Sequence, residues 1–153
     1  MANLKAFFEK ACREDMEYAG YIAKHHLISL LGEGIDATRL ARMLSVWDVW
    51  EEYELLRSYG ANPGTLKRAV SRFFSDCVAK WEVPFVKKNM GLFFERGISL
   101  DRMMKFCYSK RKYSVRRNGY VYVWQYPTRD ELKMNGLDDA TIDQNAEKYH
   151  IVG

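Results

Sequence analysis

The densest group of residues able to bind a charged ligand lies between Lys105 and Tyr126. This stretch contains Lys110-Arg-Lys112 and the pair Arg116-Arg117, with tyrosines interleaved among them and no acidic residue. Lysine and arginine neutralise phosphates and release their counterions, and tyrosine rings stack on unpaired bases. Residues of these types at this spacing therefore indicate a polyanionic ligand, with nucleic acid as the first candidate.

The net charge of +4 is distributed unevenly along the 153 residues. Residues 66–120 carry 14 basic and 4 acidic side chains, a net of +10, whereas residues 1–65 and 121–153 each carry a net of −3. Segregation of this kind favours a polyanion or an acidic protein surface as partner. A basic patch neutralised by the acidic ends of the chain is the plainer alternative.

The candidate binding residues follow from this distribution. We expect the basic side chains to contact phosphates, with a possible base contact from Arg111 and stacking by Tyr113. The predicted nucleic-acid-binding residues are Lys67, Arg68, Arg72, Arg102, Lys105, Lys110, Arg111, Lys112, Tyr113, Arg116 and Arg117.

The residues that often support catalysis or metal binding are not arranged for it here. His25 and His26 are adjacent, so they do not form the i, i+4 pair that binds zinc on a helix. No nucleotide-binding loop or hydrolase motif occurs. We therefore expect no enzymatic activity, no cofactor and no metal. An uncharacterised enzyme is the third alternative for the function.

The sequence favours a cytoplasmic protein. No apolar run reaches the roughly 18 residues of a membrane helix, and the first residues lack the apolar core of a signal peptide. Cys12, Cys77 and Cys107 are odd in number and lie among apolar neighbours, which is typical of free thiols in a reducing compartment. No heptad pattern indicates a dimer, and the oligomeric state is left open.

The fold class predicted is mainly α with one β-hairpin, in a single domain over residues 1–153. Apolar residues recur at helical spacing, and no low-complexity linker divides the chain. Gly20 weakens the first helix, and Asp48 with Glu51 resembles a capping box that divides the second. Helices are expected at about 4–31, 37–59, 63–81, 85–95, 99–111, 129–134 and 139–149.

Four junctions between these helices share one pattern. Each has a glycine, an apolar residue and a capping Asp, Asn or Ser, with Leu, Met or Ile four positions after the cap. Glycine supplies the left-handed residue that ends a helix, the cap begins the next helix, and the two apolar residues form a hydrophobic staple. The junctions are Gly34-Ile-Asp36, Gly60-Ala-Asn62, Gly97-Ile-Ser99 and Gly136-Leu-Asp138.

Residues 113–126 are predicted to form a β-hairpin around Asn118-Gly119. Asn-Gly is the preferred pair for a two-residue type I′ turn, because both positions need positive φ. The flanking residues are β-branched or aromatic, as strands prefer. A lone hairpin is only marginally stable, so we expect this one to pack on helices or to pair with another strand. Alternation places two valines on one face and the aromatic residues on the other: Val121 and Val123 against Tyr120, Tyr122, Trp124 and Tyr126.

Residues 58–70 resemble the helix-turn-helix of repressor-type DNA-binding proteins. The stretch has Gly60 in the turn, Asn62 as a cap, Leu66 in a buried position and basic residues facing outward from position 67. Pro63, at the start of the second helix, departs from that pattern. The resemblance implies that this second helix contacts DNA. An ordinary corner between two helices is the alternative.

Residues 85–126 are similar to winged-helix DNA-binding domains in the order of their elements, which is helix, turn, basic helix and hairpin. This similarity implies that the helix after Ser99 enters the major groove and that the hairpin acts as a wing along the backbone. The sequence therefore predicts a non-catalytic, regulatory nucleic-acid-binding protein, with DNA favoured over RNA. A small inhibitor or adaptor that binds an acidic protein surface is the alternative.

Overall fold

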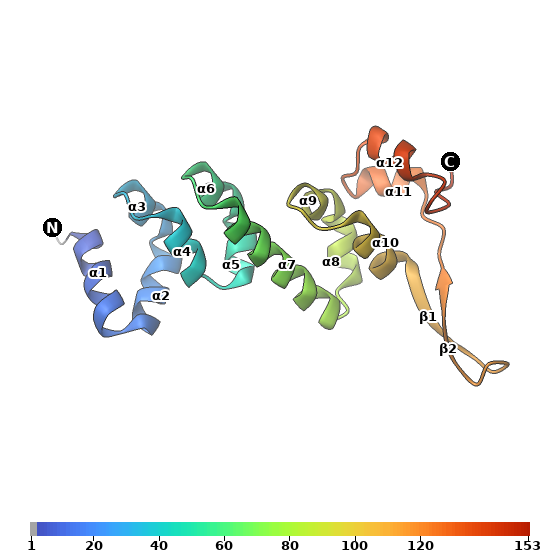
Figure 1. The fold of residues 1–153 in the computed structure, drawn as a ribbon, viewed down its shortest axis with the longest axis horizontal. Coiled ribbons are helices and arrows are strands. Elements are labelled where there is room, and N and C mark those ends of the chain that lie inside the picture. The colour runs from blue at the N-terminus through green and yellow to red at the C-terminus, as the bar shows by residue number, and fades with distance from the viewer. Residues whose placement is uncertain (1–2) are drawn as a thin grey trace. The chain divides into compact units, whose positions relative to one another are not determined.

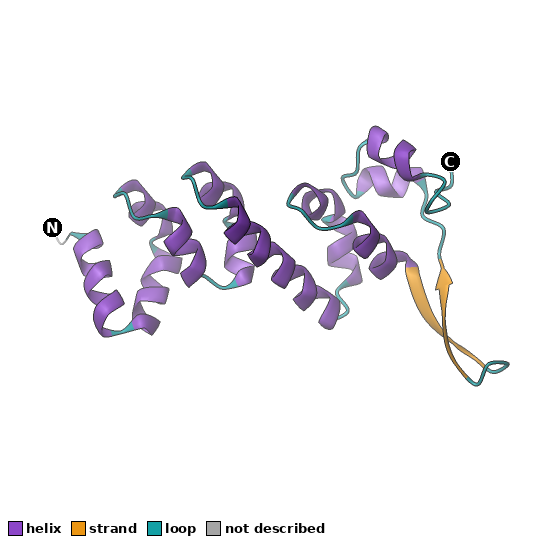
Figure 2. Cartoon of the chain, viewed as in Figure 1, coloured by secondary structure: helices purple, strands orange, loops and turns teal. Residues whose placement is uncertain are grey.

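Short helices joined by capped turns make up most of the protein, as the computed structural model shows for residues 3–153 (Figure 2). One antiparallel hairpin is the only sheet in this described part of the chain. The predicted fold class, mainly α with one β-hairpin, is confirmed. No helix in the same range combines the length and apolar character that a membrane crossing requires.

The four predicted glycine junctions are all present. Their glycines have φ between 85° and 103°, and the amide after each glycine donates to the carbonyl five residues earlier. In the first, the Ile35 amide donates to the Leu30 carbonyl at 3.1 Å, and the Asp36 carboxylate caps the following helix. The apolar residues on either side of each cap are buried: Ile35 with Leu40, Ala61 with Leu66, Ile98 with Met103, and Leu137 with Ile142.

The chain forms two compact units, Met1–Phe73 and Phe74–Gly153, and α7 contributes to both. Each unit has a buried core of its own. In the first unit Phe8, Leu30, Leu40 and Leu56 are fully buried. The sequence predicts one folding domain, and whether the two units unfold together stays a prediction. The elements of the first unit are α1 (Leu4–Glu14), α2 (Met16–His25), α3 (Leu27–Gly32), α4 (Ala37–Met43), α5 (Val46–Glu51), α6 (Tyr53–Ser58) and the start of α7 (Pro63–Ala79).

The second unit contains the remaining helices and the hairpin. Its fully buried residues include Phe93, Met103 and Leu132. The C-terminus is fixed by a bridge between Thr128 and Val152. The elements after α7 are α8 (Val83–Lys88), α9 (Met90–Glu95), α10 (Leu100–Tyr108), β1 (Ser109–Ser114), β2 (Gly119–Trp124), α11 (Arg129–Met134) and α12 (Asp139–Asn145).

Several predicted boundaries are wrong. The helix expected at 4–31 is divided at Asp15 and at His26, not at Gly20, because Asp15 is extended and its carboxylate caps α2. The capping residue of α5 is Ser45, whose hydroxyl accepts from the Asp48 amide, so Asp48 is not itself the cap. The expected division of 37–59 near Asp48 is present, between α4 and α5, but a further break at Glu52 makes three helices of that range, and 85–95 is divided into two. The last helix ends at residue 145 rather than 149.

The hairpin also differs from its prediction. It begins at Ser109, because Lys110, Arg111 and Lys112 pair with β2 instead of extending α10. Ser114 pairs with Gly119, so the turn has the four residues 115–118 rather than two. Asn118 takes the left-handed conformation, with a φ of 51°, whereas Gly119 is the first residue of β2. The basic segment is therefore strand, and the basic helix predicted at 99–111 ends at Tyr108.

Candidate nucleic-acid interface

The hairpin projects from the helices of the second unit and is anchored only at its base (Figure 1). There the Gln125 amide donates to the Tyr108 carbonyl at 2.9 Å. The Trp124 indole donates to the Tyr149 carbonyl at 2.9 Å, and the two rings stack with centroids 6.2 Å apart. The prediction that the hairpin packs on helices is therefore wrong for its outer part, whose side chains are largely exposed. The two faces of that part are available to a ligand.

One face of the hairpin, which we call the aromatic face, consists of Arg111, Tyr113, Tyr120 and Tyr122. Directly opposed residues of an antiparallel pair share a face, and Arg111 pairs with Tyr122 while Tyr113 pairs with Tyr120. The Arg111 guanidinium lies over the Tyr120 ring, 4.2 Å from its centroid. The three tyrosines are 51–73% exposed. A cation and three exposed rings on one face suit stacking on bases beside a phosphate.

The opposite face, which we call the lysine face, carries Lys110 and Lys112 beside Val121 and Val123. Cross-strand pairing places Lys110 opposite Val123 and Lys112 opposite Val121. Arg116 and Arg117 are exposed in the turn, where the Arg117 amide is held by the Ser114 hydroxyl at 3.3 Å. Among residues 3–153, no ion pair involves the five cations of the hairpin. Their charges are therefore not neutralised by this unit's own carboxylates.

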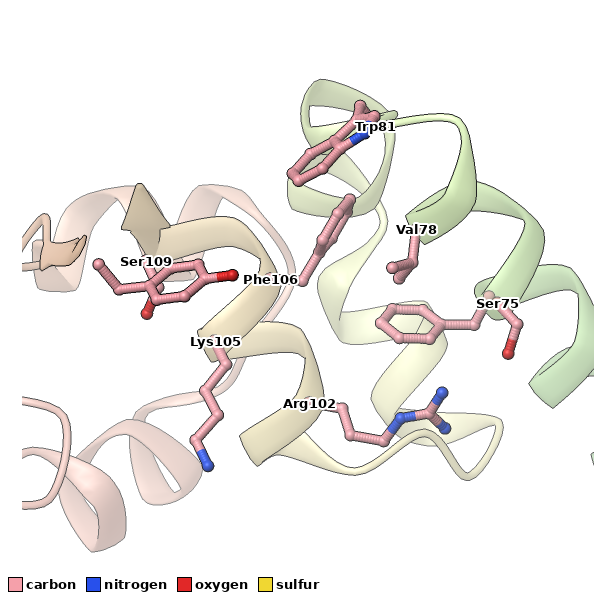
Figure 3. Close-up of a pocket in the computed structure, with 9 residues that line it drawn as sticks. Ser75, Val78, Trp81, Arg102, Lys105, Phe106 and Ser109 are labelled. Carbon is pink, nitrogen blue, oxygen red and sulfur yellow. The ribbon is translucent and has the colours of Figure 1, made fainter. Parts of the chain in front are cut away.

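A pocket of about 470 Å³ lies beside the base of the hairpin (Figure 3). In the close-up, Ser75 and Val78 of α7 face Phe106 and Arg102 of α10, and the Trp81 ring lies next to the Phe106 ring. The centroids of these two rings are 6.4 Å apart. The pocket thus combines aromatic walls with two cations: its lining residues are Phe74, Ser75, Val78, Trp81, Arg102, Lys105, Phe106, Ser109 and Tyr122.

Trp81 has an unusual backbone conformation. It follows α7 at the position that glycine occupies in the four junctions above, and its φ is 55°. The hydrogen bonds are those of the glycine junctions, since the Glu82 amide donates to the Cys77 carbonyl at 3.0 Å. A bulky residue in the left-handed region costs about 1 kcal/mol or more. The fold nevertheless places here an indole that is 69% exposed.

Asp101 connects α10 with the C-terminal segment. Its carboxylate lies 3.0 Å from the Lys105 ammonium and accepts a hydrogen bond of 3.0 Å from the Tyr149 hydroxyl. The hydrogen bond from Lys105, followed by that from Tyr149, lowers the pKa of Asp101 below its ordinary value of 3.8. Lys105 is therefore partly neutralised, unlike Arg102, whose guanidinium lies 4.9 Å from the centre of the Phe74 ring.

Replacing Asp101 with asparagine is expected to make the free energy of unfolding depend less on pH in the acidic range. A carboxyl group with a lowered pKa stabilises the fold above its ordinary value of 3.8, and this contribution is lost as the pH falls through the lowered pKa. The urea midpoint of the native chain should therefore fall more between about pH 6 and about pH 3 than that of Asp101→Asn. An equal fall of the urea midpoint in both proteins would show that the contacts of Asp101 do not contribute to the stability of the fold.

The first unit holds the remaining predicted residues. Lys67, Arg68 and Arg72 are exposed on α7, as the resemblance to a helix-turn-helix implies. Arg68 and Arg72 line a pocket of about 240 Å³ together with Arg42 from α4. The Arg68 guanidinium donates to the Thr65 hydroxyl at 3.4 Å. Three guanidinium groups beside one hollow form a local basic site, and Arg42 was not among the predicted binding residues.

No protein-family model matches this chain, and the searches of curated proteins and of solved structures also gave no match. The function must therefore be argued from the geometry of the two units. Among residues 3–153, no group of three or more His, Cys, Asp and Glu side chains is placed to hold a metal ion.

The structure gathers eight of the predicted residues in the second unit and three in the first. Lys110, Arg111, Lys112, Tyr113, Arg116 and Arg117 lie on the hairpin, and Arg102 and Lys105 line the pocket at its base. Trp81, Phe106 and Tyr122 were missed as site residues. One signal was available in the sequence. Arg102, Lys105, Phe106 and Ser109 follow one another at helical spacing, so they share a face of the chain leading out of α10.

Proposed function

We propose that this protein is a non-catalytic nucleic-acid-binding protein whose second unit provides the main binding surface. The observation that carries the proposal is the projecting hairpin, which combines five cations without ion-pair partners with three exposed tyrosines. Between Asp101 and Asp130 the sequence has no acidic residue that would repel phosphates. DNA is favoured over RNA because helix, turn, helix and hairpin follow one another as in winged-helix DNA-binding domains.

The residues have separate roles in this proposal. Lys110, Lys112, Arg116 and Arg117 contact phosphates from the lysine face and the turn. The aromatic face provides stacking by Tyr113 and a cation, Arg111, beside the rings. Arg102 and Lys105 extend the positive charge to the helical base of the hairpin, and Lys67, Arg68 and Arg72 form a second basic area in the first unit.

Binding is expected to fall steeply as salt rises. If the five cations of the hairpin each neutralise one phosphate, a plot of log affinity against log salt has a slope of about −3.5 for a single strand and about −4.5 for a duplex. Fluorescence anisotropy with duplex DNA, single-stranded DNA and RNA of equal length measures both the slope and the preferred polymer. Failure to bind any of the three at about 50 mM salt would contradict the proposal.

An acidic protein surface is the alternative partner. The lysine face favours it, since Val121 and Val123 beside two lysines combine apolar area with charge, as protein interfaces do. The two partners are separated by capturing the protein from a lysate after nuclease treatment. Recovery of one acidic protein in stoichiometric amount, together with absence of nucleic-acid binding, would favour the alternative.

We further propose that the protein works in the cytoplasm. Its three cysteines are free, and burial raises the pKa of the Cys77 thiol to about 11 and that of Cys107 to about 12. Such thiols stay protonated at neutral pH and pack as small apolar side chains. A chain that keeps buried free thiols is suited to a reducing compartment.

A further inference from the structure

We propose that the pocket at the base of the hairpin, lined by Trp81, Phe106 and Tyr122, holds an unpaired base of single-stranded DNA. This inference rests on the proposed function and adds the form of nucleic acid to it. The pocket volume of about 470 Å³ falls in the range of small-molecule sites, about 300–1,000 Å³. A base, which is flat and apolar on both sides, fits walls made of rings.

The low polarity of the pocket favours single strands over duplexes. A duplex is read by hydrogen bonds to base edges, whereas its base faces are covered by their neighbours in the stack. Here the walls offer Trp81, Phe106 and Val78, which have ring faces and aliphatic surface but few hydrogen-bonding groups. The surface is therefore complementary to an exposed base face, which only an unpaired or extruded base presents.

The positive charge at the rim of the pocket suits the phosphate backbone of a single strand whose base lies inside the pocket. Arg102 and Lys105 line the pocket, so a base inside it has two cations within reach of its phosphates. Arg102 has no acidic partner in the described chain, and Lys105 shares only the exposed carboxylate of Asp101. Exposed ion pairs of that kind exchange at little cost for a phosphate contact.

The pocket continues directly into the aromatic face. Tyr122 belongs to both, because it lines the pocket and pairs with Arg111 across the hairpin. Tyr120 and Tyr113 follow Tyr122 along the same face toward the turn. A single strand with one base in the pocket can thus place its next bases on a row of rings, with Arg111 beside them. Rings in succession next to cations are typical of single-strand-binding surfaces.

The backbone at Trp81 supports the same inference. Two other helix ends of this type in the second unit, at Gly97 and Gly136, use glycine, which adopts the left-handed conformation without strain, and a third has His150 at that position, with a φ of 50°. At Trp81 the chain accepts that strain and leaves the indole exposed, so the ring contributes little to the core. Strained conformations of this kind cluster where a side chain serves a ligand.

The substitution Trp81→Gly separates binding from folding. It removes the indole and relieves the strain, so the thermal midpoint should stay the same or rise. Three labelled ligands of about 12 nucleotides are compared at one salt concentration: oligothymidine, an abasic strand of equal charge, and a duplex. We expect the native chain to bind oligothymidine about 10-fold or more tighter than the abasic strand and the duplex. Trp81→Gly should abolish that preference without changing affinity for the abasic strand.

Two further variants keep the test specific. Phe106→Leu removes the second ring of the pocket but keeps apolar volume, and it should lower oligothymidine affinity as Trp81→Gly does. Tyr59→Ala removes a ring that is 49% exposed in the first unit, and it should leave all three affinities unchanged. A thermal midpoint of Trp81→Gly well below the native value would mean that the indole is structural, which would overturn the inference.

The outcomes separate the two proposals. Equal affinity for all three ligands, with a steep salt dependence, would overturn the base pocket and leave nucleic-acid binding intact. Tighter binding to the duplex than to oligothymidine would have the same meaning. Binding to none of them would overturn both proposals. A preference for oligothymidine that survives Trp81→Gly and Phe106→Leu would place the stacking elsewhere and contradict the assignment of this pocket.

Discussion

Replacing Arg116 and Arg117 together with glutamate is expected to weaken nucleic-acid binding by about 100-fold or more, because two phosphate contacts are lost and two repulsions replace them. Stability should hardly change. Both side chains are exposed in the turn. The hydrogen bonds of the turn do not use them, since the Arg117 amide donates to the Ser114 hydroxyl and the Asn118 amide donates to the Val115 carbonyl. The slope of log affinity against log salt should become less steep by about two.

Anisotropy titrations of the double variant measure this effect, with a matched control for the change in net charge. Lys5→Glu with Lys10→Glu makes the same change of charge on exposed residues of α1 in the first unit. That control should bind with nearly the native affinity. Equal weakening in both double variants would show that net charge, and not the hairpin, determines binding. A thermal midpoint lowered only in the hairpin variant would assign its two arginines a structural role.

Local features of the fold were predictable from the sequence because short-range physics determines them. The turns at Gly34, Gly60, Gly97 and Gly136 each need a left-handed residue, a cap and two apolar side chains, and all of these lie within a few neighbouring positions. The position of the first helix break was not predicted. Glycine at position 20 lowers helix propensity without breaking the helix, whereas the Asp15 carboxylate satisfies the free amides that begin a new one.

The hairpin shows where local reasoning fails. Lys110, Arg111 and Lys112 have good intrinsic helix propensity, and only pairing with Tyr122 and its neighbours in β2 makes them strand. Asn118 does adopt positive φ, but pairing of Gly119 with Ser114 lengthens the turn. Strand registers of this kind depend on partners many positions away in the chain.

The candidate site was only partly predictable, because its charged residues are neighbours in the sequence whereas its rings are not. Its charges could be read from the sequence, since the basic residues of the hairpin are consecutive or nearly so. The rings of the pocket come from segments far apart: Trp81 follows α7, Phe106 lies on α10 and Tyr122 on β2. Tertiary packing brings them together, and the pocket lining of the first unit adds Arg42 from α4 to two arginines of α7 in the same way.

A second large effect is expected from Gly91→Ala, which should destabilise the second unit by about 3 kcal/mol and lower its thermal midpoint by roughly 10 °C. A Cβ atom at this position would lie 2.2 Å from the Gly136 carbonyl oxygen and 2.8 Å from its Cα. The Gly91 amide also donates to the Asn135 carbonyl at 2.9 Å, so α9 is held against the junction between α11 and α12. Backbone atoms at such distances can make room for the alanine Cβ only if the two segments move apart.

Gly20→Ala is the matched control, and its effect should have the opposite sign. Gly20 lies inside α2 with no atom within 4 Å of a Cβ placed there, so alanine should stabilise the first unit by about 0.5–1 kcal/mol through helix propensity. Calorimetry of both variants also tests the prediction of a single domain. If the chain unfolds in one transition, both substitutions shift that transition. If the units unfold separately, each substitution shifts its own transition and leaves the other in place. A Gly91→Ala protein as stable as the native chain would contradict the close approach of Gly91 and Gly136.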